Sequence, residues 1–239
     1  MQNYTRRRLK EDKFAETAQG AVHWASDHRQ RVVMAIGAIL IIAVAVTGYW
    51  LWNNRQTDKA NVALGKADRT FIAPLRPAGV APAPNETMQS FSSITERGKQ
   101  AEKEFKAIAD EFSHTKPGKI ARYMEGVAAT QAGDNSTAET QLKSVADSGD
   151  KDLSALAKMS LASFYISSSR QGDAARIYKD VSDHPSTVVS KAQAQLALAE
   201  MYESTDPKQA AALYQQIEKE NPDTAAAQIA HGKVANAGK

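Results

Sequence analysis

Hydrophobic residues follow two different patterns along the chain. One uninterrupted apolar run extends from Val32 to Trp52 and contains no charged side chain. Beyond Met88, apolar residues recur at i, i+3 and i+4 in alanine-rich segments that short turns with Gly, Asp or Pro separate. This spacing is typical of amphipathic helices, and no stretch alternates as a β-strand would. The pattern predicts an all-α protein with one long apolar helix near its N-terminus.

The apolar run has the length of a membrane-spanning helix. At about 1.5 Å per residue, residues 32–52 would just cross a hydrocarbon core of about 30 Å. Tyr49, Trp50 and Trp52 lie where aromatic side chains meet lipid headgroups. A cleaved export signal is one alternative, with Ala43-Val44-Ala45 as its cleavage site, although that site falls inside the run. A helix buried in a soluble core is the other alternative.

The charges that flank the run predict its orientation. Residues 1–31 carry seven basic and four acidic side chains, so they hold the entire formal charge of +3. Residues after Trp52 carry 23 of each sign and sum to zero. The positive-inside rule therefore predicts a cytoplasmic N-terminus, with Arg6–Arg8 in a solvated basic segment, and an exported C-terminal part.

Three small residues give the predicted transmembrane helix a possible contact face. Gly37 and Gly48 are eleven residues apart, about three helical turns, and therefore lie roughly on one face with Ala45. Small residues on one face allow close approach of another transmembrane helix, although unpaired anchors also contain them. We expect a lateral contact with a membrane partner.

Composition places three further boundaries. Residues 53–73 carry Ala60, Ala63, Leu64, Ala67 and Phe71 at helical spacing, which predicts a juxtamembrane helix. Residues 74–90 form a proline-rich linker that cannot continue that helix and that we expect to be an extended spacer. Residues 91–239 are predicted to form one helical domain.

The helical domain repeats itself with a period of 36 or 37 residues. Each copy has a small residue in its first helix, an alanine in its second and a large apolar residue three or four positions later. The small residues are Gly126, Ala162 and Ala199, the alanines Ala138, Ala174 and Ala211, and the large residues Leu142, Tyr178 and Tyr214. Residues 101–118 read as the second helix of an earlier copy and 224–237 as a capping helix. Matching turns favour a solenoid over a plain helical bundle.

This pattern resembles the tetratricopeptide repeat, in which an aromatic residue follows the small residue of helix A and a proline follows helix B. The aromatic positions hold Tyr165 and Tyr202, with Ala129 in the first copy, and the exit prolines are Pro185 and Pro222. The family's tryptophan is missing and the period exceeds about 34 residues, so the copies are degenerate. The resemblance implies an α-solenoid whose helices A line a concave, partner-binding face.

The resemblance also implies which side chains contact a partner. Counting from the small helix A residues places nine side chains on the concave face: Tyr123, Val127, Thr130, Met159, Ser163, Ile166, Gln193, Glu200 and Glu203. They change from apolar in the first copy to acidic in the third. Such a face suits a protein segment with an apolar end and a basic end.

Catalytic and metal-binding patterns are missing from the sequence. The chain has no cysteine, and its five histidines show no metal-ligand spacing. No nucleophile elbow, P-loop or dinucleotide-binding glycine pattern occurs. Zero net charge beyond Trp52 argues against nucleic acid. We expect no enzymatic activity, cofactor, metal or small-molecule substrate, and protein partners only.

The arrangement as a whole resembles the YfgM-type family, ancillary subunits of the SecYEG translocon that share their repeat domain with cell-division coordinator proteins. The features that carry the resemblance are Trp24 before the run, the aromatic exit "GYWLW", and "NNRQTDKA" leading into a helix and degenerate repeats. The proline-rich linker departs from the family. The resemblance implies a bacterial inner-membrane protein whose periplasmic domain binds the translocon and periplasmic chaperones. An adaptor in envelope or cell-division complex assembly, or an accessory to an envelope enzyme, remains an alternative.

Overall fold

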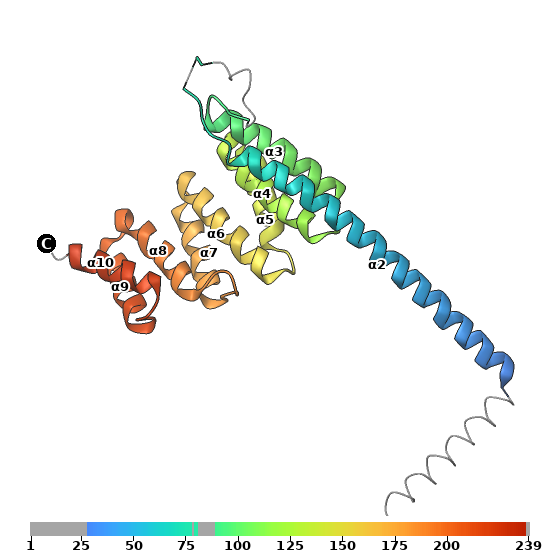
Figure 1. Ribbon diagram of the computed structural model, residues 1–239. Coiled ribbons are helices and arrows are strands. Elements are labelled where there is room, and N and C mark those ends of the chain that lie inside the picture. The colour runs from blue at the N-terminus through green and yellow to red at the C-terminus, as the bar shows by residue number, and fades with distance from the viewer. Residues whose placement is uncertain (1–27, 78, 81–88, 238–239) are drawn as a thin grey trace, which may run out of the picture. The chain divides into compact units, whose positions relative to one another are not determined.

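The computed structural model describes residues 28–77, 79–80 and 89–237 (Figure 1). The predicted basic segment, including Arg6–Arg8 and Trp24, lies outside the described residues, as does most of the middle of the proline-rich linker. Every helix or strand that the described ranges contain is an α-helix. The chain divides into two compact units, residues 1–55 and 56–239, which are described separately.

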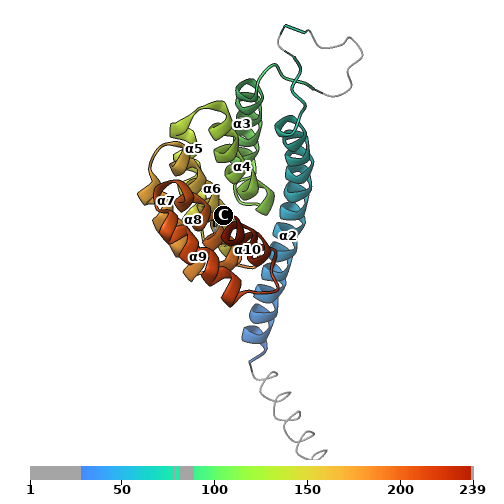
Figure 2. The same cartoon turned by 90° about the vertical axis from the view of Figure 1, so that its left-hand side faces the viewer.

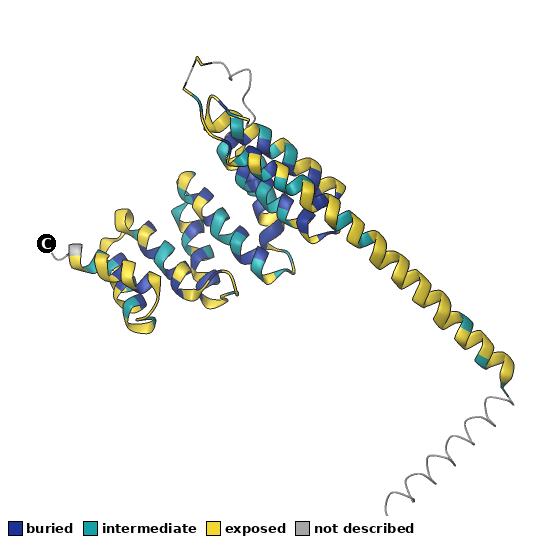
Figure 3. Cartoon of the chain, viewed as in Figure 1, coloured by how far each residue is buried: buried dark blue, intermediate teal, exposed yellow. Residues whose placement is uncertain are grey.

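The first unit contains the apolar part of helix α2, which extends from Arg29 to Phe71. An 18-residue window of α2 reaches a mean hydropathy of 2.5, and none of that window is buried (Figure 3). Ile41 and Val44 are 72% and 74% exposed. A core helix of a soluble protein would bury such side chains. The helix is long and apolar enough to cross a membrane.

The second unit is a succession of helices in which each contacts the next (Figures 1 and 2). Its helices after α2 are α3 (Ile94–Glu111), α4 (Lys116–Ala132), α5 (Asn135–Ala146), α6 (Lys151–Ser167), α7 (Gln171–Asp183), α8 (Lys191–Thr205), α9 (Pro207–Glu220) and α10 (Ala225–Ala237). In addition, α4 contacts α6 and α8 contacts α10. This order of contacts confirms the predicted α-solenoid.

The second helix of every hairpin buries the same three positions. They hold Ala101, Phe105 and Ile108 in α3; Ala138, Leu142 and Val145 in α5; Ala174, Tyr178 and Val181 in α7; and Ala210, Tyr214 and Ile217 in α9. Helix α3 is therefore the second helix of an earlier copy, as predicted, but it spans Ile94–Glu111 instead of 101–118, because α4 already begins at Lys116. The assignment of Ala211 to this pattern is wrong, because Ala210 is 3% exposed whereas Ala211 is only half-buried.

Small residues in the first helix of each hairpin allow the two helices to approach closely. Ala162 and Ala199 are fully buried. At Gly126 a methyl group would come within 2.9 Å of Leu142 Cγ, closer than carbon atoms normally pack. Gly126 is therefore required by the contact between α4 and α5.

The part of α2 that belongs to the second unit packs against α3. Ala60 and Ala67 are buried in one apolar cluster with Ala101 and Phe105. The rings of Phe71 and Phe105 lie edge to face with centroids 6.1 Å apart. Residues 56–71 therefore supply the first helix of the hairpin that α3 completes, and α2 continues without a break from the apolar run into the repeats.

The proline-rich linker begins and ends at the same place in the fold. The backbone N–H of Arg76 donates to the carbonyl of Phe91 at 2.8 Å, and that of Phe91 donates to the carbonyl of Pro74 at 3.1 Å. Leu75 and Phe91 thereby form an isolated parallel bridge. The two ends of this segment form the neck of a loop, which differs from the extended spacer expected from the prolines.

One residue in the turn after helix A takes the left-handed conformation in two hairpins. Gly133 after α4 has φ +79°, and Ser169 after α6 has φ +59°. The two positions are 36 residues apart, so the second copy places a serine where the first has a glycine. The turn after α8 is shorter, since Asp206 ends α8 and also caps α9. Serine at this φ costs backbone energy that glycine avoids.

Glu125 of α4 is a buried carboxylate in the apolar interior. It occupies the position of Leu161 in α6 and Leu198 in α8, which are core residues. Glu125 is 1% exposed, and its Oε2 atom has no hydrogen-bond partner among the described residues. Burial raises the pKa of Glu125, and the charges of Asp110 and Glu102 raise it further, whereas Lys106 and Arg122 oppose this rise.

We predict that Glu125→Leu stabilises the repeat unit. The substitution removes an unsatisfied buried oxygen, which typically costs about 1–3 kcal/mol, and restores the leucine of the other copies. Urea unfolding of the detergent-solubilised chain, followed by circular dichroism, should show a higher midpoint. Glu111→Leu at an exposed site is the control, for which a change below about 0.5 kcal/mol is expected. A lower midpoint for Glu125→Leu would contradict this account.

The raised pKa of Glu125 also predicts a pH dependence. The folded state holds the proton of this carboxyl more tightly than the unfolded state does, so the wild type is favoured at low pH. Stability should be lost as pH rises from 4.5, the ordinary value of such a carboxyl group, through the raised pKa. Against Glu125→Gln, which does not titrate, the wild type should therefore lose stability as pH rises above 4.5. Parallel curves for the two proteins would exclude a titrating Glu125.

We predict that Ser169→Gly stabilises the fold by about 0.5–1 kcal/mol, because glycine adopts positive φ without the steric cost that serine carries. Ser168, whose φ is −94°, supplies the matched control. Ser168→Gly should give no gain, since its backbone suits any residue. Thermal unfolding of the three proteins measures the difference, and an equal response of both variants would show that the turn stores no strain.

Candidate functional site

Three rows of side chains recur at equivalent places in α4, α6 and α8, and we call them the helix A rows. They are Tyr123, Met159 and Leu196; Val127, Ser163 and Glu200; and Thr130, Ile166 and Glu203. Spacings of 36 and 37 residues relate the members of each row. The rows include eight of the nine residues that the sequence predicted to contact a partner.

The members of the helix A rows that lie on α4 and α6 are mostly apolar and half-buried. Tyr123, Val127, Met159 and Ile166 pack against the central apolar cluster of the repeats without being covered by it. The Tyr123 hydroxyl lies 3.0 Å from Ser160 Oγ of α6, so this side chain also joins neighbouring hairpins. These side chains therefore both support the solenoid and present apolar atoms to solvent.

Thr130 and Ser163 are exposed and bond locally. Thr130 Oγ1 donates to the carbonyl of Gly126 at 3.1 Å, and Ser163 Oγ donates to that of Met159 at 3.1 Å. Ser163 Oγ also lies 3.3 Å from the hydroxyl of Tyr178, which reaches across from α7.

The structure places Gln193 outside the helix A rows. Its side chain accepts a hydrogen bond from the Ser190 N–H at 2.8 Å, while Ser190 Oγ accepts from the Gln193 N–H at 3.2 Å. This capping box fixes the start of α8. The residue equivalent to Met159 is Leu196, which is half-buried. The 37-residue spacing between Met159 and Leu196 was the sequence signal that identifies it.

The acidic end of the rows lies on α8. Glu200 is exposed and forms no ion pair among the described residues. Glu203 Oε1 accepts from the Tyr214 hydroxyl of α9 at 2.7 Å and from Lys233 Nζ of α10 at 2.8 Å. Lys233 and Tyr214 hold the pKa of Glu203 below its ordinary value, so Glu203 is ionised. Burial, followed by the hydrogen bond to Glu203, raises the pKa of Tyr214.

The residues predicted for the transmembrane face and its aromatic end lie on the apolar part of α2. Gly37 and Gly48 have no atom near their missing Cβ positions. Tyr49 and Trp50 are 63% and 59% exposed, and the rings of Tyr49 and Trp52 lie 6.0 Å apart. Ala45 is exposed as well. These side chains are available for lipid or for another helix.

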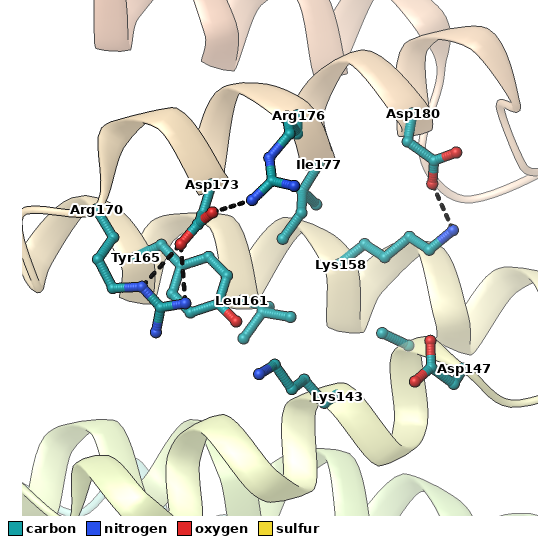
Figure 4. A pocket seen from close by; sticks show the side chains of 11 residues that line it. Lys143, Asp147, Lys158, Leu161, Tyr165, Arg170, Asp173, Arg176, Ile177 and Asp180 are labelled. Atoms are coloured by element: carbon teal, nitrogen blue, oxygen red, sulfur yellow. Dashed lines mark hydrogen bonds and ion pairs between the residues drawn. The ribbon is translucent and has the colours of Figure 1, made fainter.

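A hollow of about 430 Å³ lies between α5, α6 and α7, with a floor that includes Leu161 and Ile177 (Figure 4). The basic side chains that line it are already paired with acidic ones. Lys158 bonds Asp180 at 2.6 Å, and Arg170 bonds Asp173 at 2.8 Å. The hollow therefore offers little net charge to an ionic ligand.

Glu139 of α5 organises the charges beside this hollow. It accepts hydrogen bonds from Lys143 at 2.7 Å, from Tyr165 at 2.9 Å and from Arg170 at 3.0 Å. These donors lower the pKa of Glu139 to about 2, with Lys143 and Arg170 contributing most. The Arg170 guanidinium also stacks 3.9 Å from the Tyr165 ring centroid. This network of hydrogen bonds and ion pairs joins two hairpins. The charged groups beside the hollow therefore stabilise the scaffold.

Groups that could perform chemistry are not gathered at either place. In the described ranges, no three His, Asp or Glu side chains are grouped so that they could hold a metal ion. The hydroxyls of Tyr123 and Tyr178 lie within hydrogen-bond distance of serine oxygens, and that of Tyr214 donates to Glu203. The most distinctive surface is therefore the apolar-to-acidic set of helix A rows.

Comparison with known proteins identifies the fold family. The profile of the tetratricopeptide repeat-like domain matches residues 23–184, which include α2 to α7. The hairpin of α8 and α9, with the acidic end of the rows, lies beyond the match. Searches of curated proteins and of solved structures found no match. Because the profile covers more than half of the sequence, this chain belongs to the tetratricopeptide repeat-like domain family.

Proposed function

We propose that this protein is a membrane-anchored scaffold whose repeat unit captures protein partners on the helix A rows. Tetratricopeptide-like repeats are protein-interaction modules, and their stacked hairpins create extended binding surfaces. The observation that carries the proposal is that two of the three rows end in an acidic side chain on α8, Glu200 and Glu203, whereas their members on α4 and α6 are uncharged. The preferred partner is a segment with an apolar end and a basic end.

The proposed anchor is residues 32–52 of α2. Its exposed apolar side chains and its aromatic end at Tyr49–Trp52 support insertion into lipid. The formal charge of +3 on residues 1–31 supports a cytoplasmic N-terminus and an exported repeat unit. A bacterial inner membrane with the repeat unit in the periplasm fits this orientation.

Partners at a translocation site suit such an architecture. We infer an ancillary role beside a SecYEG-like translocon and periplasmic chaperones, because the sequence resembles the YfgM-type family in its anchor, its aromatic exit and its repeats. Segments that emerge from a translocon present apolar and basic residues before they fold, and the helix A rows match this chemistry.

Topology can be tested directly. A reporter that is active only in the cytoplasm, fused after Lys239, should be silent in cells, because the repeat unit would be exported. The same reporter fused before Met1 is the control and should be active. Activity of the C-terminal fusion, or a mature N-terminus near Val46, would contradict a retained anchor with this orientation.

We predict that Glu200→Lys weakens partner capture without unfolding the protein, because it reverses an exposed charge at the acidic end of the rows. Crosslinked partner recovered from cells should fall severalfold, as one or two charge contacts of about 1 kcal/mol would give. Asp183→Lys, an equally exposed acid at the end of α7, is the matched control and should leave the yield unchanged. Equal yields from both variants would exclude the helix A rows as the capture surface.

A further inference from the structure

A lysine of the chain itself lies at the acidic end of the helix A rows. Lys233 projects from α10 and places Nζ 2.8 Å from Glu203 Oε1. Tyr214 donates to the same oxygen at 2.7 Å and thereby orients the carboxylate. Glu200 adds a second negative charge that acts on both Lys233 and Tyr214. The fold thus presents two carboxylates and an oriented tyrosine to one ammonium group.

The surroundings of Lys233 suit the stem of a lysine as well as its charge. A hollow of about 220 Å³ lies beside the pair, with walls that include Pro207, Ala210 and Val234. Lysine covers apolar surface with its methylene groups while its ammonium group stays in water. An apolar wall next to a carboxylate therefore favours lysine over a compact cation.

We propose that Glu200 and Glu203 form a binding site for a lysine side chain of the partner segment, and that Lys233 occupies this site in the free protein. This inference rests on the proposed function and adds a competitor to it. The partner's lysine displaces Lys233, so helix α10 lowers the affinity of the rows for segments that carry lysine.

Because the ion pair of Lys233 with Glu203 is exposed, its replacement by a pair with the partner's lysine costs little free energy. The side chains of Lys233 and Glu203 are 41% and 42% exposed. Ion pairs that are exposed to this extent contribute only about 0–1 kcal/mol, so an incoming lysine loses little by displacing Lys233. Helix α10 contacts α8 and α9, and the side chain of Lys233 is partly exposed, so it can turn into solvent without moving other hairpins.

The test compares peptide binding to the full chain in detergent micelles by fluorescence anisotropy. The probe is a labelled peptide with a leucine-rich half and a half that carries two lysines; a second peptide has norleucine in place of both lysines. Lys233→Met should bind the lysine peptide about three- to fivefold more tightly than the wild type, as expected for loss of a competitor worth up to about 1 kcal/mol. Lys191→Met, which removes the 2.9 Å ion pair with Glu220, is the matched control and should bind as the wild type does.

Three further results decide the proposal. Lys233→Arg should keep the wild-type affinity, because arginine also competes, and Glu200→Gln with Glu203→Gln should bind the lysine peptide more weakly than the wild type. The norleucine peptide should bind all variants equally. Equal affinity of Lys233→Met and wild type, with thermal unfolding showing both folded, would overturn the competition while leaving the capture surface intact. Loss of the proposed function itself would appear separately, as partner capture in cells that Glu200→Lys does not reduce.

Discussion

The close approach of two helices at one small residue in each hairpin determines the geometry of the repeat unit. At Gly126 there is no room for a methyl group against Leu142, and Ala162 and Ala199 are completely buried at the same place. This contact lets each first helix pack closely against its second helix, and each hairpin contacts the next. The helix A rows exist because equivalent residues recur in hairpins that stack in this way. A larger residue at any of these sites would displace the row as well as the core.

The buried pattern of the second helices, including Tyr214 of the last hairpin, could be read from the sequence, whereas the buried alanine of that hairpin was assigned one position too late. An alanine, a large apolar residue and a β-branched residue recur through α3, α5, α7 and α9 because only side chains of those sizes fill the same space. Counting failed at Ala211 because the last turn is one residue shorter, with Asp206 both ending α8 and capping α9. Alanine occupies both position 210 and position 211, so residue type alone does not show which of the two is buried.

At the candidate surface, too, the sequence predicted the place of some side chains and not of others. Thr130, Ser163 and Glu200 are exposed as the repeat pattern implied, because exposure depends on helical periodicity. Gln193 instead closes a capping box, a local alternative that its position after Ser190 already offered. The contact of Glu203 with Lys233 joins residues 30 positions apart in different helices. No periodicity within one repeat could have predicted it, because α10 lies outside the repeat pattern.

The backbone hydrogen bonds beside Leu75 make the stability of the first hairpin independent of the length of the proline-rich linker. Hydrogen bonds among Pro74, Arg76 and Phe91 close the neck of the loop. The packing of the helices on either side therefore does not depend on how many residues the loop contains. Doubling the number of residues in a loop costs only about 0.6 kcal/mol in closure entropy. Insertions, deletions and substitutions in this segment therefore change the stability of the protein very little. The segment is a suitable place to insert an epitope or a small folded module.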